Sequence, residues 1–270
     1  MGADTKALRT RIRSVDSTLH LTKAMGLVAS SKIRHASDVM YKSRRYSQAV
    51  SDIVELLTSC NECKKSPFIK GNDSEKTRII VIAGDRGLAG GYNANVFRLA
   101  REYEGAEFIP IGKRACERFG SGYMSSENFS LEDGAKLSAE LCRDFADGKF
   151  SRLGIISTKY VSIMTQEARI SWILPLTAEK EKESKSVGTI FEPDELTIIN
   201  AAVPEYVNGK LIGYIRESYA SEVAARRIAM DSAGKNAQTM IDGLQLEYNR
   251  ARQGAITQEI TEIVAGSGEE

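Results

Sequence analysis

The sequence predicts an α/β protein in which two long terminal helices pair as an antiparallel coiled coil beside a small domain. Three observations support this prediction. All five prolines fall between residues 67 and 204, apolar residues in both terminal stretches recur every three or four positions, and short β-branched segments alternate with helical patterns in between. Proline inside a helix removes a hydrogen bond and clashes with the preceding turn. Its absence from both ends of the chain therefore permits long helices there.

The N-terminal stretch, residues 1–60, is expected to form the first helix of the pair. Its apolar residues are spaced so that they lie on one face of a helix. This stripe consists of Leu8, Ile12, Val15, Leu19, Ala29, Ile33, Ala36 and Met40. Many of its positions are small, which allows a second helix to approach closely.

The C-terminal stretch, residues 205–266, is expected to form the second helix. Its stripe consists of Met230, Ala233, Ala237, Met240, Leu244, Tyr248, Ala251 and Ala255. Two successive steps of four follow Met240 and shift the pattern toward an eleven-residue period, which reduces left-handed supercoiling. Because a single helix of about 55 residues, about 80 Å long, would leave its stripe in water, we expect the two helices to pair. Periodicity alone leaves open a static bundle of long helices.

The middle of the chain, residues 76–193, is expected to form a small Rossmann-like α/β domain with a mostly parallel sheet, because strands alternate with helices. Pro193 and Pro204 are expected to bracket a short helical stretch before the last helix. Residues 179–186 carry no apolar side chain and are expected to form a solvated loop. The expected strands are 79–83, 107–111, 153–160 and 168–174, and the expected helices are a segment around Val96–Ala100, 113–119 and 135–147.

Composition and charge exclude several classes of protein. The net charge of +1 gives no general attraction to nucleic acid or membrane. No run of apolar residues is long enough to span a bilayer, and the N-terminus lacks the apolar core of a signal peptide. The four cysteines form no disulfide framework at this length, so a reducing cytoplasmic setting fits them.

The glycine-rich segment Gly84–Gly91 follows the first strand and invites a nucleotide-binding hypothesis. Its glycine spacing matches neither the dinucleotide-binding pattern nor the P-loop pattern. We expect instead a tight turn with positive φ angles, in which Asp85 and Arg86 tie the loop to a neighbour. A nucleotide-binding enzyme with helical dimerisation arms remains the main alternative.

Other candidate chemistry is weak. His20 and His35 lie about four helical turns apart and cannot share a site within one chain. Cys60 and Cys63 have the spacing of redox and zinc sites, but no second pair lies nearby and the motif follows a helix. The basic N-terminal helix could contact a phosphate backbone, which leaves a nucleic-acid scaffold as a second alternative.

Several segments together resemble the gamma subunit of F-type ATP synthase. They occur in the order of that family and extend from residue 2 to about residue 266. They are RIRSVDST at 11–18, LTKAMGLVASSK at 21–32, GDRGLAGGYN at 84–93, FEP at 191–193 and the stretch 217–265. The chain is therefore identified by resemblance as a member of this family.

The resemblance implies a function without catalysis in this chain. The terminal helices would form the central shaft inside a ring of alpha and beta subunits, and the middle domain would sit beside the epsilon subunit and the ring of c subunits. Ion flow would turn the shaft and drive ATP synthesis, with the reverse during hydrolysis. The chain would need no cofactor or metal, bind no nucleic acid, and sit peripherally on the cytoplasmic side of the bacterial plasma membrane without inserting into it.

The resemblance also implies contact residues. Positions expected at the catalytic ring or the facing helix are Met25, Arg226, Gln253, Thr257, Glu259 and Glu262. Phe191 and Glu192 match the foot near the c ring. Glycines inside the two helices, at 26, 234, 243 and 254, each cost roughly 1 kcal/mol relative to alanine. We therefore predict that the shaft depends on its partners for full order.

Overall fold

The computed structural model describes residues 2–120, 124–177 and 191–266. The chain forms two compact units, one of residues 1–29 with 227–270 and one of residues 30–226. We call them the helix-pair unit and the α/β unit. The two longest helices, α1 (Gly2–Thr58) and α6 (Glu195–Gly266), contribute to both. The expected loop at 179–186 lies outside the described residues.

In the helix-pair unit, the end of α6 runs antiparallel to the start of α1. A Cβ atom built on Gly26 would lie 3.7 Å from Cβ of Met230, and one on Gly234 would lie 3.5 Å from Oγ1 of Thr22. Residue numbers therefore fall along α1 as they rise along α6, so the two helices are antiparallel. Of the stripe predicted on this part of α1, Leu19 is buried and Leu8, Ile12 and Val15 are partly buried.

The stripe on α6 differs from the prediction at one position. Met240 is 48% exposed, whereas the neighbouring Ile241 is partly buried. The two successive steps of four therefore run from Ala233 through Ala237 to Ile241, and the expected repeat after Met240 is wrong. Two adjacent apolar residues straddle the edge of the stripe, and the facing helix decides which one is covered.

The α/β unit contains a four-stranded sheet in the order β2-β1-β3-β4. Its strands are β1 (Thr77–Ile82), β2 (Glu107–Ile111), β3 (Arg152–Tyr160) and β4 (Gln166–Leu174). β1 pairs in parallel with β2 and β3, whereas β4 is antiparallel to β3. Only residues 161–165 join β3 to β4, which is too short for the crossover that a parallel pair requires. The prediction of a mostly parallel sheet is confirmed.

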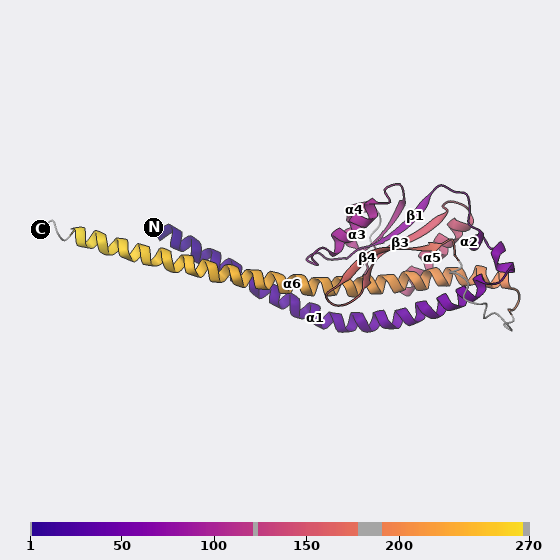
Figure 1. Cartoon of the computed structure of the whole chain (residues 1–270), viewed down its shortest axis with the longest axis horizontal. Helices are drawn as coiled ribbons and strands as arrows, with labels where there is room; N and C mark the ends of the chain where they lie inside the picture. Colours follow the sequence, from indigo (N-terminus) through magenta and orange to yellow (C-terminus); the bar gives the residue numbers. More distant parts are fainter. Residues whose placement is uncertain (1, 121–123, 178–190, 267–270) are drawn as a thin grey trace. The chain divides into compact units, whose positions relative to one another are not determined.

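Helices cover both faces of the sheet (Figure 1). α3 (Tyr92–Arg101) and α4 (Lys113–Phe119) pack against Ile79 and Val81 on one face. On the other face, α5 (Leu131–Ala146), α6 and the end of α1 enclose a larger core with Ile80 and Ile82. The alternation along β1 follows from the period of two in a strand. The chain between α1 and β1 contains a 3-10 turn, η1 (Glu62–Lys65), and the short helix α2 (Pro67–Lys70).

The predicted separation of a short helical stretch from the last helix at Pro204 is wrong. α6 begins at Glu195 and runs through Pro204 without interruption. An interior proline costs roughly 3 kcal/mol in a helix. Val203, Val207 and Leu211 on either side are fully buried in the larger core, and this burial offsets the cost.

Candidate functional site at the glycine-rich loop

The glycine-rich loop lies in the α/β unit between β1 and α3. Leu88 and Gly90 have φ angles of 60° and 58°, which confirms the prediction of a tight turn with positive φ. The amide of Gly84 donates to Oδ1 of Asn93 at 2.9 Å and closes the loop across its base. The loop is therefore held by its own residues.

Asp85 fastens this loop to the segment before α5. Its carboxylate accepts hydrogen bonds from the hydroxyl of Ser125 at 2.7 Å and from the amides of Lys113 and Glu127 at 2.9 Å each. Burial of Asp85 disfavours its charge and is the largest single effect, but the hydrogen bonds together outweigh it and lower the pKa of this carboxyl group. The predicted tying role of Asp85 is confirmed.

Glu127 connects the same region to both long helices. It lies 2.7 Å from Nζ of Lys32 on α1 and accepts a hydrogen bond from the hydroxyl of Tyr219 on α6 at 2.9 Å. Arg86 of the glycine-rich loop pairs with it at 3.5 Å. Burial opposes the charge of Glu127, yet the bonds from Lys32 and Tyr219 lower its pKa. Glu127 thus joins α1, α6 and the loop through one carboxylate.

Arg226 and Glu222 of α6 complete the contact with the loop. Arg226 donates through Nε and Nη2 to the carbonyl of Gly87, at 3.2 Å each, and forms an ion pair with Glu222. The side chain of Glu222 is only 3% exposed, and this burial raises its pKa although Arg226 acts in the opposite direction. A Cβ atom on Gly84 would lie 2.6 Å from the Glu222 carboxyl carbon, so glycine is required for this close approach.

These contacts favour an anchoring role for the loop over phosphate binding. Asp85 and Glu222 place two carboxylates against the turn, and the Gly84 amide is already used by Asn93. Phosphate sites instead present free amides and positive charge. The larger core, which contains Ile80 and Ile82, and this loop together attach the sheet to α6.

The cysteine pair lies at the end of α1, within and just before η1. Cys63 is buried, and its thiol donates to the carbonyl of Glu195 at 3.4 Å. Burial, together with the neighbouring Cys60, raises the pKa of Cys63 to about 11. Within the described residues, no group of three His, Cys, Asp or Glu side chains is placed to hold a metal ion.

The predicted contact residues are divided between the two units. Arg226 lies in the α/β unit, where its guanidinium binds Gly87 and Glu222. Met25 is partly buried on the first part of α1 in the other unit. The remaining residues predicted at the ring are exposed on the last part of α6: Gln253, Thr257, Glu259 and Glu262. Thr257 donates to the carbonyl of Gln253, and Glu262 accepts from Gln258 at 2.9 Å.

The two predicted foot residues, Phe191 and Glu192, precede α6. Phe191 packs against the larger core of the α/β unit, and Glu192 is exposed beside it. Sequence reasoning missed Glu127, Glu217 and Glu222, which hold the α/β unit together. The one available signal was that both α6 acids fall within a stretch, 217–224, of otherwise small or apolar residues, which is typical of a helix covered on all sides.

The fold and this junction define a class of protein. Two long helices pair in the helix-pair unit, and in the α/β unit the domain is joined to α1 and α6 by the partly exposed ion pairs Lys32–Glu127 and Arg169–Glu217, so the class is that of a paired-helix protein with an attached α/β domain. Of the described residues, none belongs to a helix long and apolar enough to cross a membrane.

Comparison with known proteins identifies the family. A family model described as ATP synthase matches residues 4–268. The ATP synthase gamma chain of Ruminococcus albus is 40% identical over 98% of both chains. The sodium ion specific ATP synthase gamma chain of Acetobacterium woodii is 36% identical over 99% of both. The chain belongs to the ATP synthase family, among the gamma subunits that form the central stalk of the F-type enzyme.

Solved structures share the fold. A chain of the Euglena gracilis mitochondrial ATP synthase, in an assembly titled OSCP/F1/c-ring, superposes with a TM-score of 0.69 at 17% identity. The match covers 98% of this chain and 94% of that one. A chain of the Tetrahymena thermophila mitochondrial ATP synthase, in an assembly titled central stalk/c-ring, gives a TM-score of 0.63 at 18% identity, covering 79% of this chain and 99% of that one.

Proposed function

We propose that this chain is the rotor shaft that couples ion flow to the catalytic alpha and beta subunits of an F-type ATP synthase. The single observation that carries the proposal is the correspondence to gamma chains from end to end, at 40% identity over 98% of both chains. A local resemblance to one domain would not carry a role that needs both long helices and the α/β unit.

Exposed apolar residues near the C-terminal end of α6 support the proposal that a partner binds the tip of the shaft. Ile256, Ile260, Ile263 and Val264 are between 46% and 70% exposed. Exposed apolar side chains in this number on one helical segment are typical of an interaction surface. We assign this tip to an apolar bearing in the alpha and beta ring, with Gln253, Thr257, Glu259 and Glu262 forming its polar contacts.

Rotation would act through differential contacts. A ligand or partner shifts a conformational equilibrium only by the difference in its affinity for the states. A shaft with an asymmetric surface, contacting the ring through residues such as Met25 and Arg226, would therefore stabilise a different conformation of each beta subunit at each angle. The chain itself would carry no catalytic residue and no cofactor.

The remaining partners follow from the same assignment. Phe191 and Glu192 would face the ring of c subunits, and the α/β unit would contact the epsilon subunit. The complex would sit at the cytoplasmic face of the bacterial plasma membrane, with this chain peripheral to it and bound to no nucleic acid.

Reconstitution tests the proposal. The purified chain is mixed with alpha and beta subunits, and complex formation is measured by size-exclusion chromatography with ATPase assay. We expect one copy of this chain per ring and ATPase activity that depends on its presence. If no stoichiometric complex with ATPase activity forms, or if the chain alone turns over ATP, the proposal is wrong.

A charge-matched pair of variants tests the assigned contacts. Glu259→Ala with Glu262→Ala is compared with Glu247→Ala with Asp242→Ala, which removes the same charge from another exposed part of α6. We expect only the first pair to weaken assembly with the ring, by several-fold. Equal effects of both pairs would contradict the assigned contacts while leaving the rotor role to the reconstitution result.

A further inference from the structure

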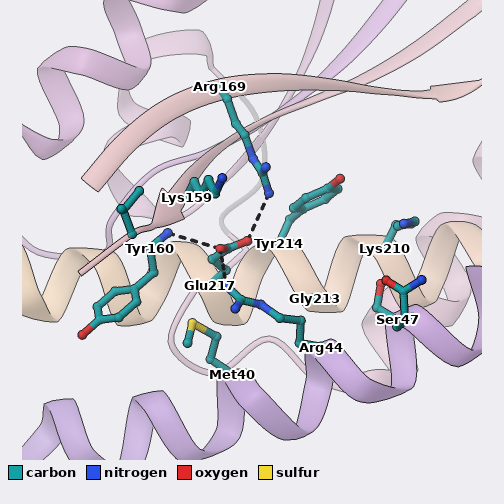
Figure 2. Close-up of a pocket in the computed structure, with 12 residues that line it drawn as sticks. Met40, Arg44, Ser47, Lys159, Tyr160, Arg169, Lys210, Gly213, Tyr214 and Glu217 are labelled. Atoms are coloured by element: carbon teal, nitrogen blue, oxygen red, sulfur yellow. Dashed lines mark hydrogen bonds and ion pairs between the residues drawn. The ribbon is translucent and has the colours of Figure 1, made fainter. Parts of the chain in front are cut away.

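A cleft of about 430 Å³ opens in the α/β unit between α1, α6 and the strands β3 and β4 (Figure 2). It is distinct from the glycine-rich loop and from every predicted contact residue. The charged residues that line it are Arg44, Lys159, Arg169, Lys210 and Glu217. Among the lining residues that the structure describes, four are cationic and one is a carboxylate.

The carboxylate of Glu217 lies between the two arginines (Figure 2). Its side chain is 8% exposed and accepts hydrogen bonds from Nη2 of Arg44 at 2.7 Å and Nη2 of Arg169 at 3.3 Å. The amide of Tyr160 donates to it at 3.2 Å. One negative charge is shared by two guanidinium groups, so Glu217 compensates only part of the charge of Arg44 and Arg169.

Arg169 has hydrogen-bonding capacity left over. Its Nε is buried and has no hydrogen-bond partner among the residues that the structure describes. The guanidinium carbon of Arg169 lies over the ring of Tyr214, 5.5 Å from its centroid. A guanidinium binds an oxyanion best through two parallel N–H groups. An unpartnered donor on a positioned guanidinium is the feature that such an anion would satisfy.

We propose that this cleft binds a small, multiply charged phosphate group, either free or carried by a nucleotide. Arg169 and Arg44 would supply directional N–H donors, and Lys159 and Lys210 would supply charge. The cleft has the volume of a small-molecule site. Two of its cations, Arg44 and Arg169, meet at one carboxylate instead of following a line, which favours a compact anion over an acidic peptide.

Calorimetric titration of the full-length chain tests this at low ionic strength with inorganic phosphate, pyrophosphate, ADP and adenosine. We expect saturable one-site binding of pyrophosphate that weakens as salt is added. Lys159→Gln with Lys210→Gln should weaken it at least about tenfold. The control, Lys42→Gln with Lys76→Gln, removes the same charge from residues outside the cleft and should leave binding within about twofold.

A conservative variant separates a binding role from a structural one. Arg169→Lys keeps the charge but loses the forked geometry, so binding should fall several-fold while the far-UV circular dichroism stays unchanged. If ADP binds as pyrophosphate does and adenosine does not, the site recognises the phosphates of nucleotides as well. If only the inorganic anions bind, the site recognises free phosphate or pyrophosphate and not a nucleotide.

Three results would overturn the inference: no saturable binding of phosphate or pyrophosphate, equal loss in the two lysine pairs, or binding of an acidic peptide in place of the phosphates. The inference holds or fails independently of the rotor function, because each readout uses the chain without the alpha and beta subunits.

Discussion

The α/β unit and the helix-pair unit bury their apolar side chains to very different extents. In the α/β unit, core residues such as Ile80, Ile155 and Leu211 are fully buried, and helices cover both faces of the sheet. In the helix-pair unit, the stripes are mostly only partly buried, and Leu27 and Ile263 are at least 70% exposed. Burial of apolar surface is the main source of stability. The difference teaches that one unit is stabilised by its own core, whereas the other has surface to bury against partners.

The largest expected effect comes from the aromatic cluster in the core of the α/β unit. Phe145 is 1% exposed and packs against Phe68 and Phe150, with ring centroids 6.0 and 5.5 Å away. Phe145→Ala should lower the free energy of unfolding of this unit by about 3–5 kcal/mol. The fluorescence of Trp172, the single tryptophan, reports on this unit during denaturation.

The matched control is Leu131→Ala, at a position 64% exposed at the start of α5, which should cost less than about 0.5 kcal/mol. A loss below about 1 kcal/mol for Phe145→Ala would show that the α/β unit does not depend on this core.

A smaller effect is expected where the glycine-rich loop meets α6. A Cβ atom on Gly84 would collide with the buried carboxylate of Glu222, so Gly84→Ala should destabilise the α/β unit by about 1–3 kcal/mol. Gly105→Ala serves as the control because no atom lies within 4 Å of the added Cβ. Chemical denaturation followed by Trp172 fluorescence gives both values, and equal midpoints would contradict the close packing.

Acid should reveal the contribution of Asp85. Its pKa is lowered in the folded protein, so its stabilisation is present above the pKa of the unfolded state, near 4, and is lost as the pH falls through the folded value. Asp85→Asn should remove about 1–2 kcal/mol at neutral pH and less at lower pH. Urea unfolding between pH 3 and 7 measures this, and a pH-independent difference between variant and parent would contradict the account.

The smallest expected effect lies in the helix-pair unit. Gly243 and Gly254 have no atom within 4 Å of an added Cβ, so each substitution by alanine should favour the helix by up to about 1 kcal/mol. Hydrogen exchange on α6 beyond residue 227 detects the change, with exchange in the α/β unit as the internal control. Slower exchange is expected only in the helix-pair unit, and no change there would mean that helix propensity does not limit its order.

The sequence predicted the helices and strands better than it predicted which of their side chains are covered by a neighbouring element. The steps of three and four identified the stripes because the helical period depends only on local geometry. They could not choose between Met240 and Ile241, because the facing helix makes that choice. The antiparallel direction of β4 follows from the short connection between β3 and β4. It could have been predicted from the sequence once the ends of the two strands were known.

The contacts of the buried acids Glu217 and Glu222 were the least predictable part of the structure. An acidic residue in a helix normally points to solvent, and the small and apolar residues around Glu217 and Glu222 give only a weak local sign that both are buried. Their burial depends on Arg44, Arg169 and Arg226, two of which lie far away in the chain. Asp85 was easier to interpret, because a short acid in a glycine-rich turn has few local roles other than fixing that turn.

The central claim is that the helix-pair unit is ordered by the ring it turns in. Hydrogen exchange of the chain alone and in the reconstituted complex tests this most directly. We expect the helices and strands of the α/β unit to be protected in both states, and residues 2–29 and 227–266 to be weakly protected alone and strongly protected in the complex. Full protection of those helices in the isolated chain, or no change on assembly, would contradict the claim.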